Sequence, residues 1–583
     1  MGPTVETAVV AETAGSGLRS KFQRARLGWV AMSAIGQGPL IVQSDRTVLL
    51  EVGSPQADEA RHELAVFAEL ERAPEFVHTY RITRLGLWNA RAAGHTAEQM
   101  LATLERYAKF PVPQTVTLDI EETVGRYGRL VISRDAEGGL IITATDPAVL
   151  AEITRSSKVG PFLGIRRSST EWTVQPWARG QIKQELLKLG WPAEDLAGYT
   201  PGTPHDIELD TTSGWHVRPY QQQAIDSFFE GGSGVVVLPP GAGKTIVGAG
   251  AMAAADTTTL ILVTNTVSAR QWRSELLRKT SLTEQEIGEY SGEVKEVRPV
   301  TIATYQILTA KRKGEFAHLA LLDAKDWGLV IYDEVHLLPA PVFKLTADLQ
   351  ARRRLGLTAT LVREDGREND VFSLIGPKRF DAPWREIEAQ GYIAPATCYE
   401  VRIDLPQDER LEYAAASDDE RYRLAATAPA KLAVAKELVT KHAGELILVI
   451  GTYLDQIDEL ATTLGAPQLT GSTPTAERER LYEEFRTGRT KVLVVSKVAN
   501  FSIDLPEATV AIQVSGSFGS RQEEAQRLGR LLRPKASGIP ASFYTLVARD
   551  TVDQDFAQNR QRFLAEQGYA YTILNADELS EAA

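Results

Sequence analysis

Two series of short, β-branched apolar runs constrain the fold of this chain more than any other feature. Fully apolar runs, separated by segments long enough for a crossover helix, are typical of parallel strands buried on both faces. The first series is VVVL at 235, TLILVT at 259, VTIATY at 300, LVIYDE at 329 and RRLGLTAT at 353, and the second is LILVIGTY at 446, KVLVVSK at 491 and ATVAIQVS at 508. They predict two tandem α/β domains that divide near Ile393.

The part of the chain before residue 205 has a different texture. Residues 39–131 alternate helix-like stretches with brief strands, and residues 140–200 form a further unit ending in a predicted helix closed by Gly190. At 583 residues the chain is long enough for about three to five domains. The predicted organisation is a disordered leader at 1–30, a mixed α+β domain at 31–135, a small domain at 136–205, α/β domains at 206–392 and 393–574, and an acidic tail at 575–583.

Composition excludes several classes of site. Cys398 is the only cysteine, so intramolecular disulfides, thiolate zinc fingers and four-cysteine iron–sulfur clusters are excluded. The net charge of −12 still permits a local positive groove on an acidic surface. The small-apolar run at 246–255 is shorter than the ~20 residues that span a bilayer. We therefore expect no membrane helix and a cytoplasmic location.

A phosphate-binding loop follows the first predicted strand. Glycines let backbone N–H groups surround a phosphate, and the N-terminus of the following helix adds its dipole. The side chain of Lys244 would reach the β and γ phosphates, and Thr245 would hold magnesium. The leading glycine of the longer loop is replaced by Leu238. The predicted nucleotide-binding residues of this loop are Gly241, Ala242, Gly243, Lys244 and Thr245.

Two adjacent acids end the strand LVIYDE. Because the carboxyl ends of parallel strands meet at one edge of a sheet, these acids would lie beside the phosphate loop. We expect Asp333 to bind magnesium and Glu334 to polarise the attacking water. His336 would couple the site to a neighbouring segment. The sequence thus predicts an ATPase that uses ATP and Mg²⁺.

The second α/β domain supplies a basic segment, QRLGRLLRPK. Arg530 and Arg533 are three residues apart and would share one helix face. From there they would project across an interdomain cleft as arginine fingers, with Gln526 in the same catalytic set. A solvated basic helix is the alternative interpretation.

Basic and aromatic residues are interleaved between Arg155 and Trp191. This stretch holds seven Lys or Arg against two Glu, together with three tryptophans. Basic side chains meet phosphates while rings stack on bases, so the pattern is typical of a nucleic-acid surface. The alternative is a small domain with core tryptophans and solvated charges. The candidate DNA contacts are Arg166, Arg167, Trp172 and Trp177.

Taken in order, these motifs resemble those of the superfamily 2 helicases, and the chain is similar to the XPB family of DNA repair helicases. The generic motifs are the phosphate loop, DEVH, TAT at 358 and QRLGRLLR. More specific strings are RPYQQQAI at 218, DEVHLLPAPVF at 333, LGLTATLVREDG at 355, LIGPKRFDAPWREIEAQGYIA at 374, SIDLPEA at 502 and RQRFLAEQGYAY at 560. The resemblance covers nearly all of residues 39–573.

The resemblance implies a fold and an activity. Two tandem RecA-like parallel-sheet domains would stand behind mixed α+β N-terminal domains, with residues 136–205 in the place of the damage-recognition domain. The expected activity is that of an ATP-dependent translocase on double-stranded or forked DNA with 3′→5′ helicase polarity, acting in repair or transcription. An RNA helicase and a slow ATP-gated DNA clamp that does not track are the alternatives.

The resemblance also implies roles for individual residues. Arg218 and Gln221 would contact adenine, and Asp504 would sense the nucleotide. The residues expected in coupling and strand opening are Thr358, Thr360, Arg363, Glu364 and Asp365, in addition to His336. The family's DNA-gripping thumb would fall near 405–428, where acids outnumber bases. The chain looks like a bacterial or archaeal form, and a nuclease or another repair protein is its expected partner.

Overall fold

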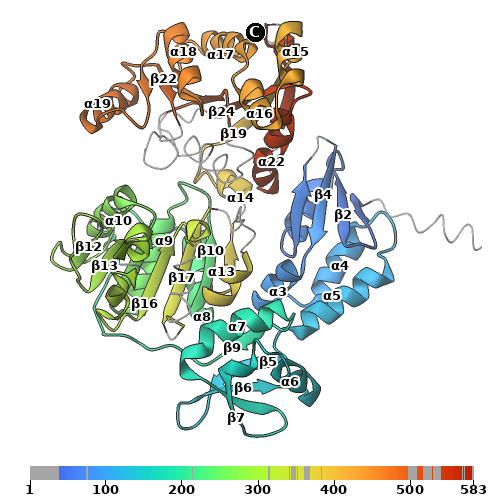
Figure 1. Ribbon diagram of the computed structural model, residues 1–583, viewed down its shortest axis with the longest axis vertical. Coiled ribbons are helices and arrows are strands. Elements are labelled where there is room, and N and C mark those ends of the chain that lie inside the picture. The colour runs from blue at the N-terminus through green and yellow to red at the C-terminus, as the bar shows by residue number, and fades with distance from the viewer. Residues whose placement is uncertain are drawn as a thin grey trace, which may run out of the picture.

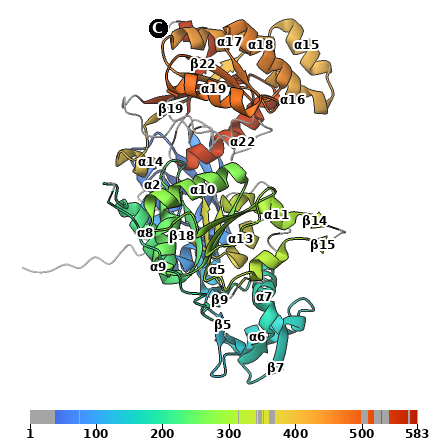
Figure 2. The same cartoon turned by 90° about the vertical axis from the view of Figure 1, so that its left-hand side faces the viewer.

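The computed structural model describes residues 38–580 except 74–75, 213, 313–314, 340–341, 343–348, 351, 360–367, 383, 497–507, 517–527, 529–539, 568 and 570. Four larger sheets organise the described residues, and Figure 1 shows each with its own helices. The C-terminal α/β domain lies at one end of the molecule and a small five-stranded domain at the other (Figures 1 and 2).

The N-terminal domain is an antiparallel sheet in the order β1-β2-β4-β3. Its strands are β1 (Leu40–Val42), β2 (Thr47–Glu51), β3 (Ala68–Arg72) and β4 (Val77–Ile82), and its helices are α2 (Ala57–Leu64), α3 (Arg84–Ala92), α4 (Ala97–Tyr107) and α5 (Gln114–Arg126). Inward-facing residues of β4 alternate with half-buried ones, as one buried face requires.

The small domain has the strand order β7-β8-β6-β5-β9. Its elements are β5 (Leu130–Arg134), β6 (Leu140–Ala144), α6 (Pro147–Thr154), β7 (Leu163–Arg166), β8 (Glu171–Val174), α7 (Arg179–Lys188) and β9 (Ala193–Asp195). β5 belongs to this sheet, so the sheet begins before the domain boundary predicted at 135. β5 forms a hairpin with β6 through a turn that ends at Gly139, whose N–H donates to Asp135.

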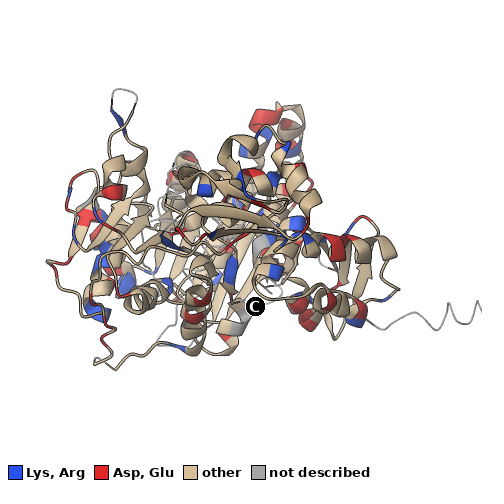
Figure 3. Cartoon of the chain, turned by 90° about the horizontal axis from the view of Figure 1, so that it is seen from below, with Lys and Arg blue, Asp and Glu red and all other residues tan. Residues whose placement is uncertain are grey.

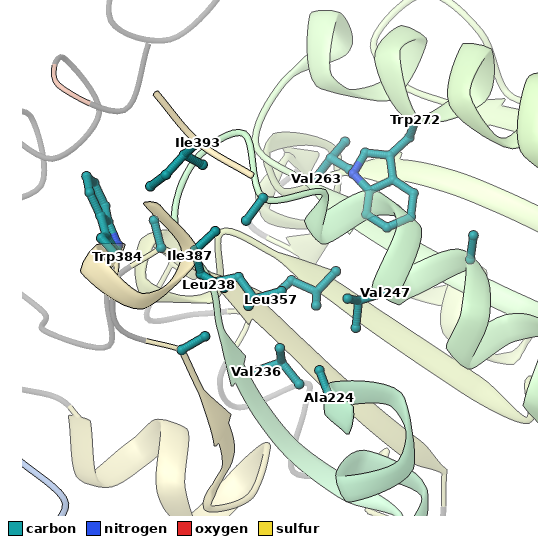
Figure 4. Close-up of a cluster of buried hydrophobic side chains, with 14 of the residues drawn as sticks. Ala224, Val236, Leu238, Val247, Val263, Trp272, Leu357, Trp384, Ile387 and Ile393 are labelled. Atoms are coloured by element: carbon teal, nitrogen blue, oxygen red, sulfur yellow. The ribbon is translucent and has the colours of Figure 1, made fainter. Parts of the chain in front are cut away.

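The first α/β domain contains a seven-stranded sheet in the order β12-β13-β11-β16-β17-β10-β18. Its strands are β10 (Ser233–Val237), β11 (Thr259–Val263), β12 (Ile287–Tyr290), β13 (Val300–Thr304), β16 (Leu329–Asp333), β17 (Arg353–Thr358) and β18 (Lys378–Asp381). The helices that matter below are α8 (Pro219–Gly231), α9 (Lys244–Ala255), α10 (Thr266–Lys279) and α13 (Glu368–Leu374). Figure 4 shows side chains such as Val236, Leu357 and Trp272 gathered in its core.

A second seven-stranded sheet has the order β21-β22-β20-β23-β24-β19-β25. Its strands are β19 (Ala396–Ile403), β20 (Ile447–Ile450), β21 (Gln468–Leu469), β22 (Val492–Val495), β23 (Val510–Gln513), β24 (Ala541–Ala548) and β25 (Tyr571–Asn575). Every described strand pair in the two seven-stranded sheets is parallel. The prediction of two tandem RecA-like parallel-sheet domains is therefore confirmed.

Helices cover the second sheet and shape the end of the chain. They are α15 (Gln407–Ala415), α16 (Asp418–Ala426), α17 (Pro429–Lys441), α18 (Leu454–Leu464), α19 (Thr475–Arg486) and α22 (Val552–Glu566). Within the acidic tail predicted at 575–583, residues 576–580 form a short 3₁₀-helix. Leu579 in this helix is 2% exposed and packs into the core of the second sheet, so an apolar anchor outweighs the neighbouring acids.

The helix pair α15 and α16 lies where the resemblance placed a thumb. Acids fill the first turns of both helices, and α15 has no buried residue. Tyr422 on α16 is buried, and its hydroxyl donates to the carbonyl of Gly516. Within the described ranges, no helix is both long enough and apolar enough to span a bilayer.

Candidate nucleotide-binding site

The predicted catalytic motifs meet at one edge of the first seven-stranded sheet. β16, β17 and β10 are neighbouring parallel strands, with Asp333 opposite Leu357 and Thr358 opposite Val237. The phosphate loop, residues 241–245, follows β10 directly. Since parallel strands present their carboxyl ends together, the loop, the acid pair and Thr358 share this edge. The structure thus brings together three motifs that lie more than 110 residues apart at their extremes.

The backbone of the phosphate loop has a shape that only glycine accepts easily. Gly241 and Gly243 have φ angles of 80° and 82°, in the left-handed region. A Cβ on Gly243 would also lie 2.4 Å from Nε2 of Gln221. Gly243 caps helix α9, which begins at Lys244. The loop therefore sets the direction of the helix N-terminus, and at Gly243 it leaves no room for a side chain.

The start of helix α8 supports this loop from behind. The hydroxyl of Tyr220 and Nε2 of Gln221 both donate to the carbonyl of Ala242, at 2.7 and 2.8 Å. Oε1 of Gln221 accepts from the backbone N–H of Arg218 at 2.9 Å. The Arg218 guanidinium lies 4.6 Å from the centre of the Tyr392 ring. Gln221 thus holds the phosphate loop, and the adenine contact of Arg218 and Gln221 stays a prediction.

The acid pair is held in a fixed orientation by its neighbours. Oδ2 of Asp333 accepts from the Trp272 indole at 2.8 Å, and Oδ1 accepts from the backbone N–H of Glu334 at 3.0 Å. The Tyr305 hydroxyl donates to the Asp333 carbonyl at 2.8 Å. Burial, together with the adjacent Glu334 carboxylate, raises the pKa of Asp333 to about 6. A cation at Asp333 would relieve both effects.

Glu334 lies between an ammonium group and an imidazole ring. Its carboxylate lies 3.6 Å from the Lys244 ammonium and 3.4 Å from Nδ1 of His336. Burial alone would raise the pKa of Glu334, but Lys244 and His336 outweigh it and hold this pKa below its ordinary value. Nδ1 of His336 also lies 2.6 Å from the hydroxyl of Thr358. A continuous series of contacts therefore joins Lys244, Glu334, His336 and Thr358.

The residues at this edge fit a nucleotide with Mg²⁺. The donor set is the Thr245 hydroxyl and the Asp333 carboxylate, and hard oxygen donors are what Mg²⁺ prefers. The described residues contain no group of three or more His, Cys, Asp or Glu placed to hold a metal. Mg²⁺ suits such a sparse set, because it keeps several waters and shares phosphate oxygens. The glycine loop and Lys244 would surround the phosphates of such a nucleotide.

Eight of the predicted site residues lie outside the described residues. They are Thr360, Arg363, Glu364, Asp365, Asp504, Gln526, Arg530 and Arg533. The arginine fingers, the nucleotide-sensing Asp504 and the strand-opening element therefore stay predictions.

The candidate DNA contacts in the small domain fall into two kinds. Trp177 is 58% exposed and meets Phe162 edge-on, with ring centres 5.8 Å apart. Arg166 is exposed, and its Nε donates to the Ser168 carbonyl. Trp172 is half-buried against the core of the small domain. The geometry supports a role in DNA contact for Arg166 and Trp177 more than for Trp172.

Ion pairs within the small domain lower the number of basic side chains that are available to contact DNA. Arg167 is paired with Asp135. Arg179 and Lys183 are 3% and 8% exposed, and both bind the Asp195 carboxylate. Burial against Asp195 therefore leaves five of the seven basic residues of this stretch as candidates for contact with DNA. Figure 3 shows Lys and Arg interspersed with Asp and Glu along the ribbon.

Three supporting residues escaped the sequence analysis. Tyr220 stands beside Gln221 in the RPYQ string, so its place at the start of α8 was a usable signal. Trp272 and Tyr305 follow other strands, 61 and 28 residues before Asp333. No spacing rule links them to the acid pair, and only the strand order brings them together.

Three family models match this chain. The model described as ERCC3/RAD25/XPB C-terminal helicase matches residues 387–582, and the one described as type III restriction enzyme, res subunit, matches residues 215–363. A third, described as helicase conserved C-terminal domain, matches residues 40–168.

Curated relatives match over almost the whole chain. A Kineococcus radiotolerans protein named DNA 3'-5' helicase XPB is 66% identical over 542 residues, which cover 93% of this chain and 97% of that protein. The Mycobacterium tuberculosis protein of the same name is 63% identical, with 93% and 98% covered. The general transcription and DNA repair factor IIH helicase/translocase subunit XPB of Antonospora locustae is 34% identical, with 93% and 82% covered.

Proposed function

Because this chain belongs to the XPB family of DNA helicases, we propose that it is an ATP-dependent 3′→5′ DNA helicase and double-stranded DNA translocase that opens DNA for repair or transcription. Two relatives more than 60% identical to this chain carry the name DNA 3'-5' helicase. The observation that carries the proposal is the series of contacts from Lys244 through Glu334 and His336 to Thr358. It links a phosphate-binding group to Thr358, the first residue of the TAT motif that is expected in coupling.

Each residue of the nucleotide site has a role in hydrolysis. Lys244 and the loop N–H groups bind the phosphates, and Glu334 takes the proton of the attacking water. The lowered pKa of Glu334 suits this role, because the carboxylate must be ionised before it can accept a proton. Thr245 and Asp333 would hold Mg²⁺, which neutralises charge on the phosphates. Arg530 and Arg533, with Gln526, would complete the site from the second α/β domain.

Coupling to DNA would begin at His336. Hydrolysis would remove the negative charge of the terminal phosphate beside Glu334. This would change the electric field at His336, whose ring shares a hydrogen bond with Thr358. Thr358 leads along the chain to Thr360 and to the residues proposed for strand opening, Arg363, Glu364 and Asp365. Asp504 would report the nucleotide state from the second α/β domain.

The small domain would contact DNA through Arg166 and Trp177. Arg166 offers an exposed guanidinium for phosphate, and Trp177 offers an exposed ring for stacking on an unpaired base. A nuclease or another repair protein is the proposed partner, and a cytoplasmic location is proposed with it. Crosslinking in cells, followed by identification of the bound protein, tests the partner.

The test of this function compares ATP hydrolysis on several nucleic acids. The ATPase rate should rise with duplex and forked DNA and should rise less with RNA of the same sequence. A larger rise with RNA would support an RNA helicase instead. Stimulation by duplex DNA without any displacement of a third strand from a triplex would support a clamp that does not track.

A further inference from the structure

Helix α7 of the small domain lies against helix α13 of the first α/β domain. Nε2 of Gln184 on α7 donates to Oδ1 of Asp370 on α13 at 2.9 Å. Both side chains are half-buried, so this hydrogen bond is partly shielded from water. The two residues are 186 positions apart in the chain. The bond therefore joins two domains and does not stabilise one helix.

Helix α13 is tied in turn to the strand that carries Thr358. The carbonyl of Leu374, at the end of α13, accepts from Nε of Arg354 and from Nε2 of Gln350, each at 2.8 Å. Arg354 is 1% exposed and lies on β17, four positions before Thr358. A displacement of α13 would therefore act on β17 through a buried charged hydrogen bond. The last residue of that strand is the partner of His336.

Helix α7 is fixed equally firmly on the other side. Arg179 and Lys183 on α7 bind Asp195 at the end of β9, at 2.8 Å each. The Tyr199 ring lies between Arg179 and Arg354, with each guanidinium 5.7 Å from its centre. Because breaking such a buried charge cluster is costly, α7 would move with the sheet of the small domain.

Next to this contact the domains are not tightly packed. A cavity of about 380 Å³ lies between the small domain, the N-terminal domain and the first α/β domain. Its lining includes Lys183 and Glu194 of the small domain, Ser373 and Arg379 of the first α/β domain, and Tyr127 at the end of α5. Close packing resists movement, whereas a polar cavity of this size admits water. The α7–α13 contact thus borders a polar cavity where the three domains meet.

We propose that the α7–α13 contact couples the small domain to the ATP site, with Gln184 and Asp370 as positioning residues. DNA held by the small domain would shift α7, and the shift would pass through α13 and Arg354 to the Thr358 end of β17. Coupling of this kind is reciprocal, so the nucleotide state should also alter DNA affinity. The inference rests on the proposed function, because it requires an ATPase that DNA stimulates.

The test measures basal and duplex-stimulated ATPase rates of the full-length chain. Gln184→Ala and Asp370→Ala should each keep the basal rate and lose about 2- to 10-fold of the stimulation, the range for one hydrogen bond. The double variant should lose no more than either single variant, because both remove the same bond. Gln184→Glu should lose more, since it places a carboxylate against Asp370. Asn369→Ala, at an exposed and uncharged position of α13 next to Asp370, is the matched control and should behave as the parent.

A second readout separates coupling from a structural role. The change in duplex affinity between the ADP-bound and ATP-analogue-bound states should shrink in Gln184→Ala, while its melting temperature stays near that of Asn369→Ala. Parent-like stimulation in both single variants, or additive losses in the double variant, would overturn the inference. A parallel fall in basal rate and melting temperature would also overturn it, in favour of a packing role. A parent chain that duplex DNA does not stimulate would instead refute the proposed function.

Discussion

Removing the amide of Gln221 tests how the phosphate loop is held. Gln221→Ala deletes the hydrogen bond to the Ala242 carbonyl and the one from the Arg218 N–H. Each such bond contributes about 0.5–1.5 kcal/mol net. The Ala242 carbonyl keeps its bond from Tyr220, so the loss should lie near 1–2 kcal/mol. This corresponds to about 5- to 30-fold weaker nucleotide binding.

The assay compares two competitive inhibitors of ATP hydrolysis, ADP and inorganic tripolyphosphate. If Gln221 acts by holding the phosphate loop, both inhibition constants should rise by the same factor, because tripolyphosphate has no base. If Gln221 reads adenine, only the constant for ADP should rise. Gln222→Ala is the control, since Gln222 is exposed on the same helix and bonds to Asp226. Equal constants for Gln221→Ala and Gln222→Ala would refute the reasoning.

Three further predictions concern DNA contact and stability. Trp177→Ala should weaken binding to forked DNA by about 1–3 kcal/mol per unstacked base, measured by fluorescence anisotropy, and leave intact duplex almost unaffected; equal losses on both would contradict stacking. Burial, with help from Arg61, lowers the pKa of His78 to about 4, so between its ordinary value and pH 4 the unfolded chain binds a proton that the folded chain does not. Stability should therefore fall as the pH falls through this window, and the melting temperature of His78→Gln should fall less; an identical pH dependence would exclude His78 as the cause. Lys431 and Asp553 form a fully buried ion pair at 2.6 Å, so Lys431→Met should cost about 3–5 kcal/mol in urea unfolding, and an unchanged transition would be the contrary result.

Strand patterns and glycine chemistry made the motor domains predictable. VVVL, LVIYDE and RRLGLTAT are local signals, and each became a parallel strand with its motif at the carboxyl end. Asp333 and the phosphate loop could be placed together because parallel strands share one edge. The sequence predicts a coupling role for His336 but does not identify Thr358 as its partner, because only the pairing of β16 with β17 brings the two together.

What escaped prediction depends on partners remote in sequence or on burial. The neighbours of a basic residue in the sequence do not determine whether its side chain is exposed to solvent. No local pattern therefore identified Arg179 and Lys183 as partners of Asp195. Leu579 has acidic neighbours in the sequence, and its burial depends on packing against the second sheet. The Gln184–Asp370 bond needs the packing of two domains, which no periodicity specifies.

The central claim is that DNA opening requires ATP hydrolysis with Glu334 as the base. A strand-displacement assay of Glu334→Gln tests this claim directly. The substrate is a duplex with a 3′ single-stranded tail, with a 5′-tailed duplex of the same sequence as its control. The parent should displace the strand of the 3′-tailed duplex with ATP and leave the 5′-tailed duplex intact. Glu334→Gln should bind ATP as the parent does, but it should displace a strand from neither duplex above background. Displacement by Glu334→Gln at the parent rate would contradict the account.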